Sequence, residues 1–330
     1  ALDKDAVSAI LNTSGATFQQ GEIEAISTKV ISELSDADQK ALLVLGGAAD
    51  NTKVTTLTAK QIAAFNPVMV GTLEAADFAA LNTTQIKAFS AAQVKLIDME
   101  EFTANFKDLS AKQIAALDAD TQIAGLANDH LKDLDKTQVA AFTNAQVAKL
   151  DMTELGDQVQ FFTAKQIAAI DTTKIADVDV TKLNVTQVKA FTAAQLVEVD
   201  FTKFGNDADG KDQLAALTTK QLAGTGIGAK LATLSGTQIK SLTPQQVASL
   251  GKDTITALAG ADLIKEMTDG QLKAISVKAM AGLTDAHIAD LAKEQIAVLT
   301  DKQIGSLTKE QAAGLTGELA TALTKDQIAK

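Results

Sequence analysis

The chain has 330 residues, with 41 acidic residues against 30 Lys and a formal charge of −11, and it holds two His and no Cys, Trp, Tyr or Arg. Without Cys it cannot form a disulfide scaffold, a thiol nucleophile or a Cys-ligated zinc or iron–sulfur site. The negative charge and the lack of Arg exclude nucleic acid as an expected partner, because phosphate is repelled and bidentate recognition is missing.

The first 56 residues differ from the rest of the chain. The segment from Phe18 to Leu45 has the spacing of amphipathic helices, with Ser35 or Asp36 as an internal cap, and Gly46-Gly47 ends the apolar run. The longest apolar stretch lies at 41–49 and is about half of what a membrane-spanning helix needs. We therefore predict an N-terminal helical cap domain over 1–56 and no transmembrane segment.

An eight-residue repeat follows over 57–330. Its form is Leu-(Thr/Ser/Asp/Asn)-x-x-Gln-(Ile/Val/Leu)-x-Ala, and each octad begins at a large apolar residue, as at Leu57, Phe65, Leu73 and Leu81. The Gln position of the octad is held by Gln61, Gln85, Gln93, Gln113, Gln138, Gln146, Gln166, Gln187, Gln195, Gln238, Gln246, Gln271, Gln295, Gln303 and Gln327. A fixed period of this kind predicts a repeat architecture.

The octad is incompatible with one long helix. Eight residues are about 2.2 helical turns, so an apolar stripe would rotate by roughly 80° in each repeat. The repeat is rich in Ala, Gln, Lys and Leu, which disfavours strands. The sequence therefore predicts a short helix of about two turns that restarts in every octad.

The second position of the octad explains the restart. It holds residues that favour the N-cap position: Thr58, Asn82, Ser90, Ser110, Asp118, Asp135, Thr143, Thr163, Thr192, Thr243, Thr300 and Thr308. Where this residue is Thr or Ser, the Gln three positions later completes a capping box, and the flanking Leu and Ile form a hydrophobic staple. Pro67 and Pro244 follow a cap residue directly, at the helix position that tolerates proline.

Helices this short need neighbours to cover their apolar edges. Stacked pairs of octads predict an all-α fold, an α-solenoid or superhelical array, and a compact bundle of short helices is the alternative. The octad slips near 102–109 and 151–162, and most clearly over 201–211. These slips predict changes of direction in the array, with a subdivision near 201–212.

The segment 205–212 also contains a candidate calcium site formed by Asp207, Asp209 and Asp212. With Gly210 as the turn glycine of an EF-hand loop, Asp207 and Asp209 fall on ligand positions, but the first and twelfth positions lack carboxylates. An acidic loop at a break of the repeat is the alternative. We expect no other cofactor.

Other candidate sites are explained by the repeat. The glycines over 224–230 resemble a phosphate loop, but Lys230 is followed by Leu231 and no strand precedes the segment. His130 and His287 each follow the first Leu of an octad by four residues, so they replace the Gln. No group of residues converges on a catalytic pattern, and we expect the protein not to be an enzyme.

The tandem form Leu-Thr-x-x-Gln-Ile-x-Ala-Leu, seen at 57–65 and 299–307, is similar to short repeats of large bacterial secreted or surface proteins of the adhesin and S-layer type. The resemblance covers about four-fifths of the chain. It implies an extracellular or cell-surface location and a structural or adhesive role, with a protein, a cell-surface polymer or self-association as the partner. The alternative is a secreted effector or toxin segment that binds a host protein. Both ends of the sequence are expected to be cut from a longer chain.

Overall fold

The computed structural model describes residues 2–13, 18, 20–43 and 57–329. Two compact units, Ala1–Asp171 and Thr172–Lys330, each have their own internal contacts, and each is described by itself. Their division falls earlier in the chain than the subdivision predicted near 201–212, which lies within the second unit. The Gly46-Gly47 stop and the approach to the predicted boundary at 56 lie outside the described residues. Both predicted domain boundaries stay predictions.

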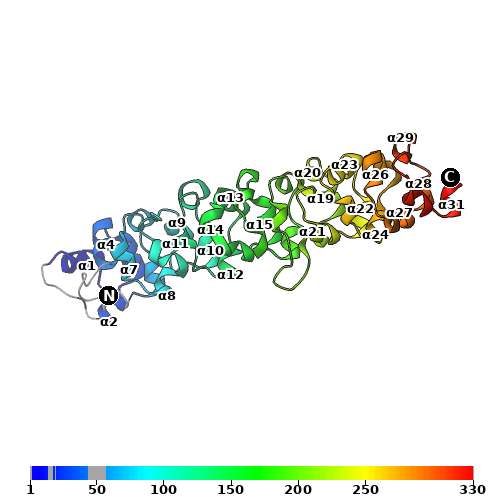
Figure 1. Cartoon of the computed structure of the whole chain (residues 1–330). Coiled ribbons are helices and arrows are strands. Elements are labelled where there is room, and N and C mark those ends of the chain that lie inside the picture. Colours follow the sequence, from blue (N-terminus) through cyan, green and yellow to red (C-terminus); the bar gives the residue numbers. More distant parts are fainter. Residues whose placement is uncertain (1, 14–17, 19, 44–56, 330) are drawn as a thin grey trace. The chain divides into compact units, whose positions relative to one another are not determined.

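The fold is an all-α repeat array, as the sequence predicts. Within the described residues there is no strand, and an isolated antiparallel bridge joins Asn206 and Asp212. Short helices follow one another along each unit (Figure 1).

The α-helices of the first unit are α1 (Lys4–Leu11), α2 (Gln20–Ala25), α3 (Thr28–Glu33), α4 (Asp36–Leu43), α5 (Ala59–Ile62), α6 (Pro67–Val70), α7 (Ala75–Ala79), α8 (Thr83–Ile86), α9 (Ala91–Val94), α10 (Ala111–Ile114), α11 (Asn128–Leu131), α12 (Lys136–Val139), α13 (Asn144–Lys149), α14 (Met152–Leu155) and α15 (Ala164–Ala169). Its 3₁₀-helices are η3 (Thr103–Asp108) and η5 (Gly156–Phe161), and η4 (Ala119–Ile123) is a π-helix.

The α-helices of the second unit are α16 (Val185–Val188), α17 (Ala193–Leu196), α18 (Gln213–Ala216), α19 (Thr219–Leu222), α20 (Ile227–Leu231), α21 (Gly236–Lys240), α22 (Pro244–Ala248), α23 (Lys252–Gly260), α24 (Asp269–Ala274), α25 (Val277–Met280), α26 (Asp285–Ala289), α27 (Lys293–Val298), α28 (Asp301–Ile304), α29 (Lys309–Ala312), α30 (Glu318–Thr321) and α31 (Lys325–Ile328). Its 3₁₀-helices are η6 (Thr172–Asp177), η7 (Val180–Lys182), η8 (Phe201–Lys203) and η9 (Ile264–Glu266).

The cap residues start these helices as expected. Thr58 is a representative case: its hydroxyl accepts from the backbone N–H of Gln61 at 3.3 Å, while the Gln61 side chain accepts from the Thr58 N–H at 2.8 Å. Asn82 and Asp135 complete the same capping box, so the motif extends beyond Thr and Ser. Pro67 and Pro244 occupy the first helical turn.

The repeat helices are shorter than the two turns expected. Most span four to six residues, as in α5 and α13. The rest of the octad continues in tighter turns, because Phe65 N–H bonds the Ile62 carbonyl three residues earlier, at 3.3 Å. The extended backbone of the next cap residue, such as Asn66 with ψ 126°, then ends the turn.

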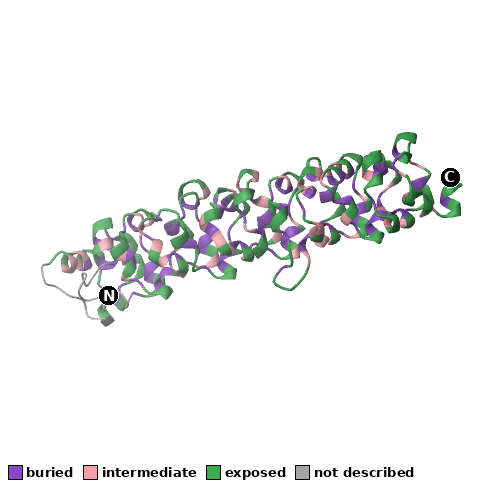
Figure 2. Cartoon of the chain, in the orientation of Figure 1, coloured by how far each residue is buried: buried purple, intermediate pink, exposed green. Residues whose placement is uncertain are grey.

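Helices three octads apart pack side by side within each unit. Such pairs include α5 with α8 and α6 with α9 in the first unit, and α25 with α28 in the second. Two apolar positions of each octad form the core, as with Ile62 and Phe65, which are 0% and 2% exposed. Figure 2 shows buried and exposed segments alternating along each unit. Burial of these side chains supplies the stability that a one-turn helix lacks alone.

Candidate functional site

The Gln of each octad bonds in two directions. Gln93 is fully buried, and its Oε1 accepts from the Ser90 backbone N–H at 2.7 Å. Its Nε2 donates to the carbonyls of Ile62 and Phe65, both at 2.9 Å. One side chain therefore caps the start of its own helix and satisfies carbonyls at the end of a helix in the preceding turn, where backbone acceptors have no partner within the helix. We call this arrangement the glutamine clamp.

The clamp recurs in both units. Its Nε2 donates to two carbonyls that lie three residues apart in the chain at Gln61, Gln93, Gln113, Gln122, Gln146, Gln166, Gln213, Gln221, Gln238, Gln246, Gln271, Gln303 and Gln311. Outside the first clamp, at Gln61, the donor lies between 24 and 37 residues after the acceptors, and the largest separation belongs to Gln238. This separation, three octads to about four and a half, is the length of one turn of the array, and it is longest where the turn includes the irregular segment 205–212.

Sequence reasoning identified the helix-capping half of the clamp and missed the half that joins turns. It also missed Gln122, Gln213, Gln221 and Gln311 as members. Gln221 and Gln311 follow Thr218 and Thr308 by three residues, so the cap spacing could have found them. Gln122 accepts from the backbone N–H of Asp118, four residues earlier, because the helix between them, η4, is a π-helix. The octad pattern places the cap and the Gln three residues apart, so it does not include Gln122.

His130 takes the place of Gln in a clamp, as its position in the octad predicts. Its Nδ1 accepts from the Ala127 N–H at 3.2 Å, and its Nε2 lies 2.9 Å from the Met99 carbonyl and 3.0 Å from the Thr103 hydroxyl. The ring is 6% exposed and stands edge-on to Phe106, with centroids 5.5 Å apart. Each polar atom of this buried ring has a structural partner.

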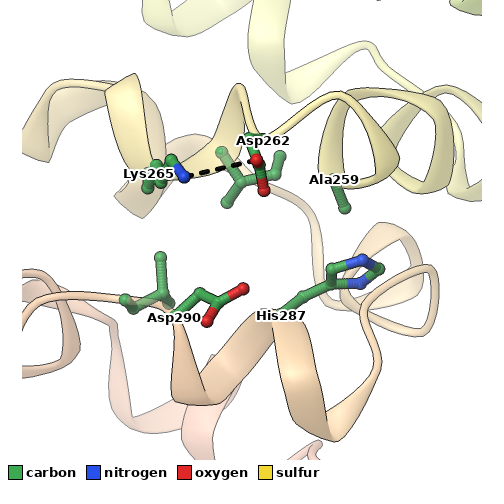
Figure 3. Close-up of a pocket in the computed structure, with 7 residues that line it drawn as sticks. Ala259, Asp262, Lys265, His287 and Asp290 are labelled. Carbon is green, nitrogen blue, oxygen red and sulfur yellow. Dashed lines mark ion pairs between the residues drawn. The ribbon is translucent and has the colours of Figure 1, made fainter.

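His287 occupies the same octad position in a more open setting. Its Nδ1 accepts from the Thr284 N–H at 3.1 Å, and the residue is half-buried. A small pocket beside it has Asp262 and Lys265, paired at 3.4 Å, on one wall, with His287 and Asp290 on the facing wall (Figure 3). No cluster of three or more His or acidic residues suited to a metal is found in the described part of the chain.

The candidate calcium ligands have separate structural partners. Asp207 is 6% exposed and accepts from the backbone N–H groups of Asp209 and Lys211 through Oδ1, and from Val185 through Oδ2. The bond from Lys211, with those from Val185 and Asp209, holds the pKa of Asp207 below its ordinary value. Asp209 is exposed beside Lys211, and Asp212 caps α18 by accepting from the Ala215 N–H. Calcium binding by these residues stays a prediction.

The glycine-rich segment 224–230 leads into the short helix α20. Gly226 has φ +86°, a conformation that favours glycine, and it lies close to Val197. Gly228 packs against Thr254 of α23, where an added Cβ would lie 3.1 Å from the Thr254 Cα. These glycines therefore have a packing role in this turn of the array.

The comparisons identify a repeat. Residues 70–100 match the model of the ALTTAQ repeat family. The matched stretch is about as long as one turn of the array. It contains α7, α8 and α9, with the capping boxes of Asn82 and Ser90. No curated protein matches the chain. In the described residues, no helix has the length and apolar character required to cross a bilayer. The chain thus contains an all-α repeat array, and one segment of it, residues 70–100, is similar to the ALTTAQ repeat.

Proposed function

We propose that the chain is a non-enzymatic structural or adhesive repeat region of an exported bacterial protein that resides at the cell surface or in a matrix. The observation that carries the proposal is the use of the buried polar side chains. Among the described residues these are the clamp-position glutamines and Gln39, together with Asp38, His130 and Asp207. Polar groups that an enzyme would direct at a substrate are used here to join one turn to the next.

The outer surface supports a binding role through repetition. The fourth position of several octads carries an exposed lysine, as at Lys60, Lys112, Lys165 and Lys302. Similar side chains at one position of several octads favour many weak contacts with a polymer or with further copies of the chain, because linked weak contacts add up to tight binding. Export and surface residence rest on the resemblance to secreted and surface repeats.

Location in the native cell tests the proposal. We expect antibody labelling of intact cells to detect the protein at the surface, and external protease to remove the label. Isolated cell envelopes should retain the purified chain, and Lys→Gln substitutions at Lys60, Lys112 and Lys165 should weaken retention stepwise. As a matched control, Lys→Gln at Lys132 and Lys240, which pair with Asp129 and Glu266, should change retention less.

Retention in the cytoplasm, or turnover of a glycan, peptide or ester, would overturn the proposal. Capture of one host protein at nanomolar affinity, with no retention by envelopes, would favour the effector alternative.

A further inference from the structure

The clamp of His130 differs chemically from the glutamine clamps around it. A backbone N–H can only donate, so the bond from Ala127 N–H requires Nδ1 to be an unprotonated acceptor. Nε2 then carries the ring proton and donates toward the Met99 carbonyl. The structure therefore requires the neutral ring with hydrogen on Nε2, whereas a glutamine amide keeps one form across the physiological pH range.

Protonation would disrupt this clamp. A second ring proton on Nδ1 would face the Ala127 N–H, donor against donor, and the charge would be buried beside Phe106. The open clamp exposes the ring to water, where both ring nitrogens can carry a hydrogen and donate to solvent. Because opening then binds a proton that the closed clamp does not, acid favours the open form.

The charged groups on the elements around this ring are exposed or half-buried. They are Asp129, Lys132 and Asp133 on or next to α11, Lys107 and Asp108 on the packed helix η3, Glu154 on the packed helix α14, and Glu100 and Glu101 before η3. Asp129 is 69% exposed and pairs with Lys132, and Glu154 accepts from the Asn128 N–H. In the described structure the hydrogen bonds of the ring go to Ala127, Met99 and Thr103, and none goes to a carboxylate.

We propose that His130 is a pH-sensitive joint: in acid its protonation opens the contact between residues 127–131 and the preceding turn at 99–103. The two turns are held together at high pH and loosened in acid, while the glutamine clamps on either side stay closed. The device would change the local stiffness of the first unit in an acidified environment.

His287 provides the internal comparison. It sits at the same octad position and also accepts a cap N–H, but the half-buried ring faces a pocket with Asp262 and Asp290 (Figure 3). In the described residues no carbonyl of the preceding turn accepts from its Nε2. Protonation of His287 would break the bond from its own cap residue Thr284 and no bond to a carbonyl of the preceding turn, so it should have little effect on contacts between turns.

Amide hydrogen exchange of the full chain tests the joint. Wild type and H130Q, which restores the common residue of the repeat, are compared at the same pH, so that the intrinsic pH dependence of exchange cancels. At pH 5.5 we expect peptides covering 97–110 and 127–134 to exchange up to about tenfold faster in wild type than in H130Q. At pH 7.5 the two proteins should agree within about twofold. H287Q should behave as wild type in these peptides.

The reciprocal variant is Q146H. It places a ring in the buried clamp that joins Gln146 to Ile114 and Leu117, and it should add acid-induced exchange at 113–118 and 143–150. Equal exchange of wild type and H130Q at pH 5.5 would overturn the proposal. The same conclusion would follow if H287Q abolished the acid effect at 97–110.

Discussion

Two segments of the second unit solve the same problem with different sequences. In the regular octad, the Thr243 N–H bonds Oε1 of Gln246 at 2.6 Å, and Nε2 reaches the carbonyls of Leu214 and Leu217. In the irregular segment, the Gly205 N–H bonds Oε1 of Gln213 at 3.0 Å, and Nε2 reaches Val180 and Leu183. The cap and the Gln are three residues apart in the first case and eight in the second.

The comparison identifies the irregular segment as an octad with an insertion. Residues 206–210 lie between Gly205, whose N–H bonds Gln213, and the tripeptide Lys211-Asp212-Gln213. Without these inserted residues, Gly205 would precede Lys-Asp-Gln as Thr324 does in the regular octad Thr324-Lys-Asp-Gln327. Asp207 organises the inserted loop through its three backbone bonds, and Gly210, at φ +75°, allows the tight turn. The contact between turns is therefore kept even where the local capping box is lost.

The three slips of the octad share one further device. Each supplies a carboxylate that accepts from the first backbone N–H of a helix in the preceding turn: Glu101 from Ala75 at 2.8 Å, Glu154 from Asn128 at 2.6 Å, and Asp207 from Val185 at 3.1 Å. Negative charge is favourable at a helix start. The slips thus add capping between turns, and at α16 this bond supplements a complete capping box within the octad.

The largest expected effect comes from the apolar anchor before each cap. Phe204 and Leu242 are 3% and 2% exposed, and Phe204→Ala should lower the free energy of unfolding by about 3–5 kcal/mol and Leu242→Ala by about 2–5 kcal/mol. Urea unfolding measures both. Val277→Ala, at a 45% exposed position, should change stability by under about 0.5 kcal/mol. A mild effect at Phe204 alone would mean that the inserted octad is not anchored like the regular one.

Loss of the clamp amide should come next. Gln246→Leu leaves the Thr243 N–H and the Leu217 carbonyl without side-chain partners, at an expected cost of about 2–4 kcal/mol. Gln213→Leu should cost as much, since it loses the equivalent bonds. The neighbouring exposed residue provides the control, because Gln245→Leu should be close to neutral. If Gln213→Leu were as mild as the control, the two segments would not share a clamp.

Removal of the insertion should have a small effect. Deleting residues 206–210 with Gly205→Thr recreates a regular octad, in which the introduced threonine replaces Asp212 as the cap of α18 and the Asp207 bond to Val185 is lost. We expect the free energy of unfolding to stay within about 1 kcal/mol of wild type. A drop of more than about 2 kcal/mol, or loss of protection at the Val180–Leu183 turn, would show that the loop is required for the fold.

The smallest expected effect concerns acid and the loop. The pKa of Asp207 is below its ordinary value of 3.8, so its contribution is present above about pH 4 and is lost as pH falls through that lowered pKa. Exchange of the Val185, Asp209 and Lys211 amides should accelerate only below this range. Asp207→Asn, whose amide Nδ2 cannot accept from the Val185 N–H, should show faster Val185 exchange already at pH 7. Equal Val185 exchange in both proteins would contradict this role.

Much of the local structure follows from the sequence. The cap residues, the capping boxes, the positions of Pro67 and Pro244 and the all-α repeat array are confirmed, because each depends on residues within one octad. Ser35 is confirmed as an internal cap, since its hydroxyl accepts from the Asp38 N–H at 3.1 Å. His130 and His287 also lie at the clamp position that the spacing predicts.

Only the tertiary structure decided which carbonyls the side-chain Nε2 of each clamp Gln bonds. The octad alone determines that Oε1 caps its own helix, since donor and acceptor are three residues apart. The partners of Nε2 lie one turn away, 28 and 31 residues before Gln93, and no local pattern specifies that distance. The winding of the chain also distinguishes two histidines of identical register, because it places a carbonyl against His130 and an open pocket beside His287.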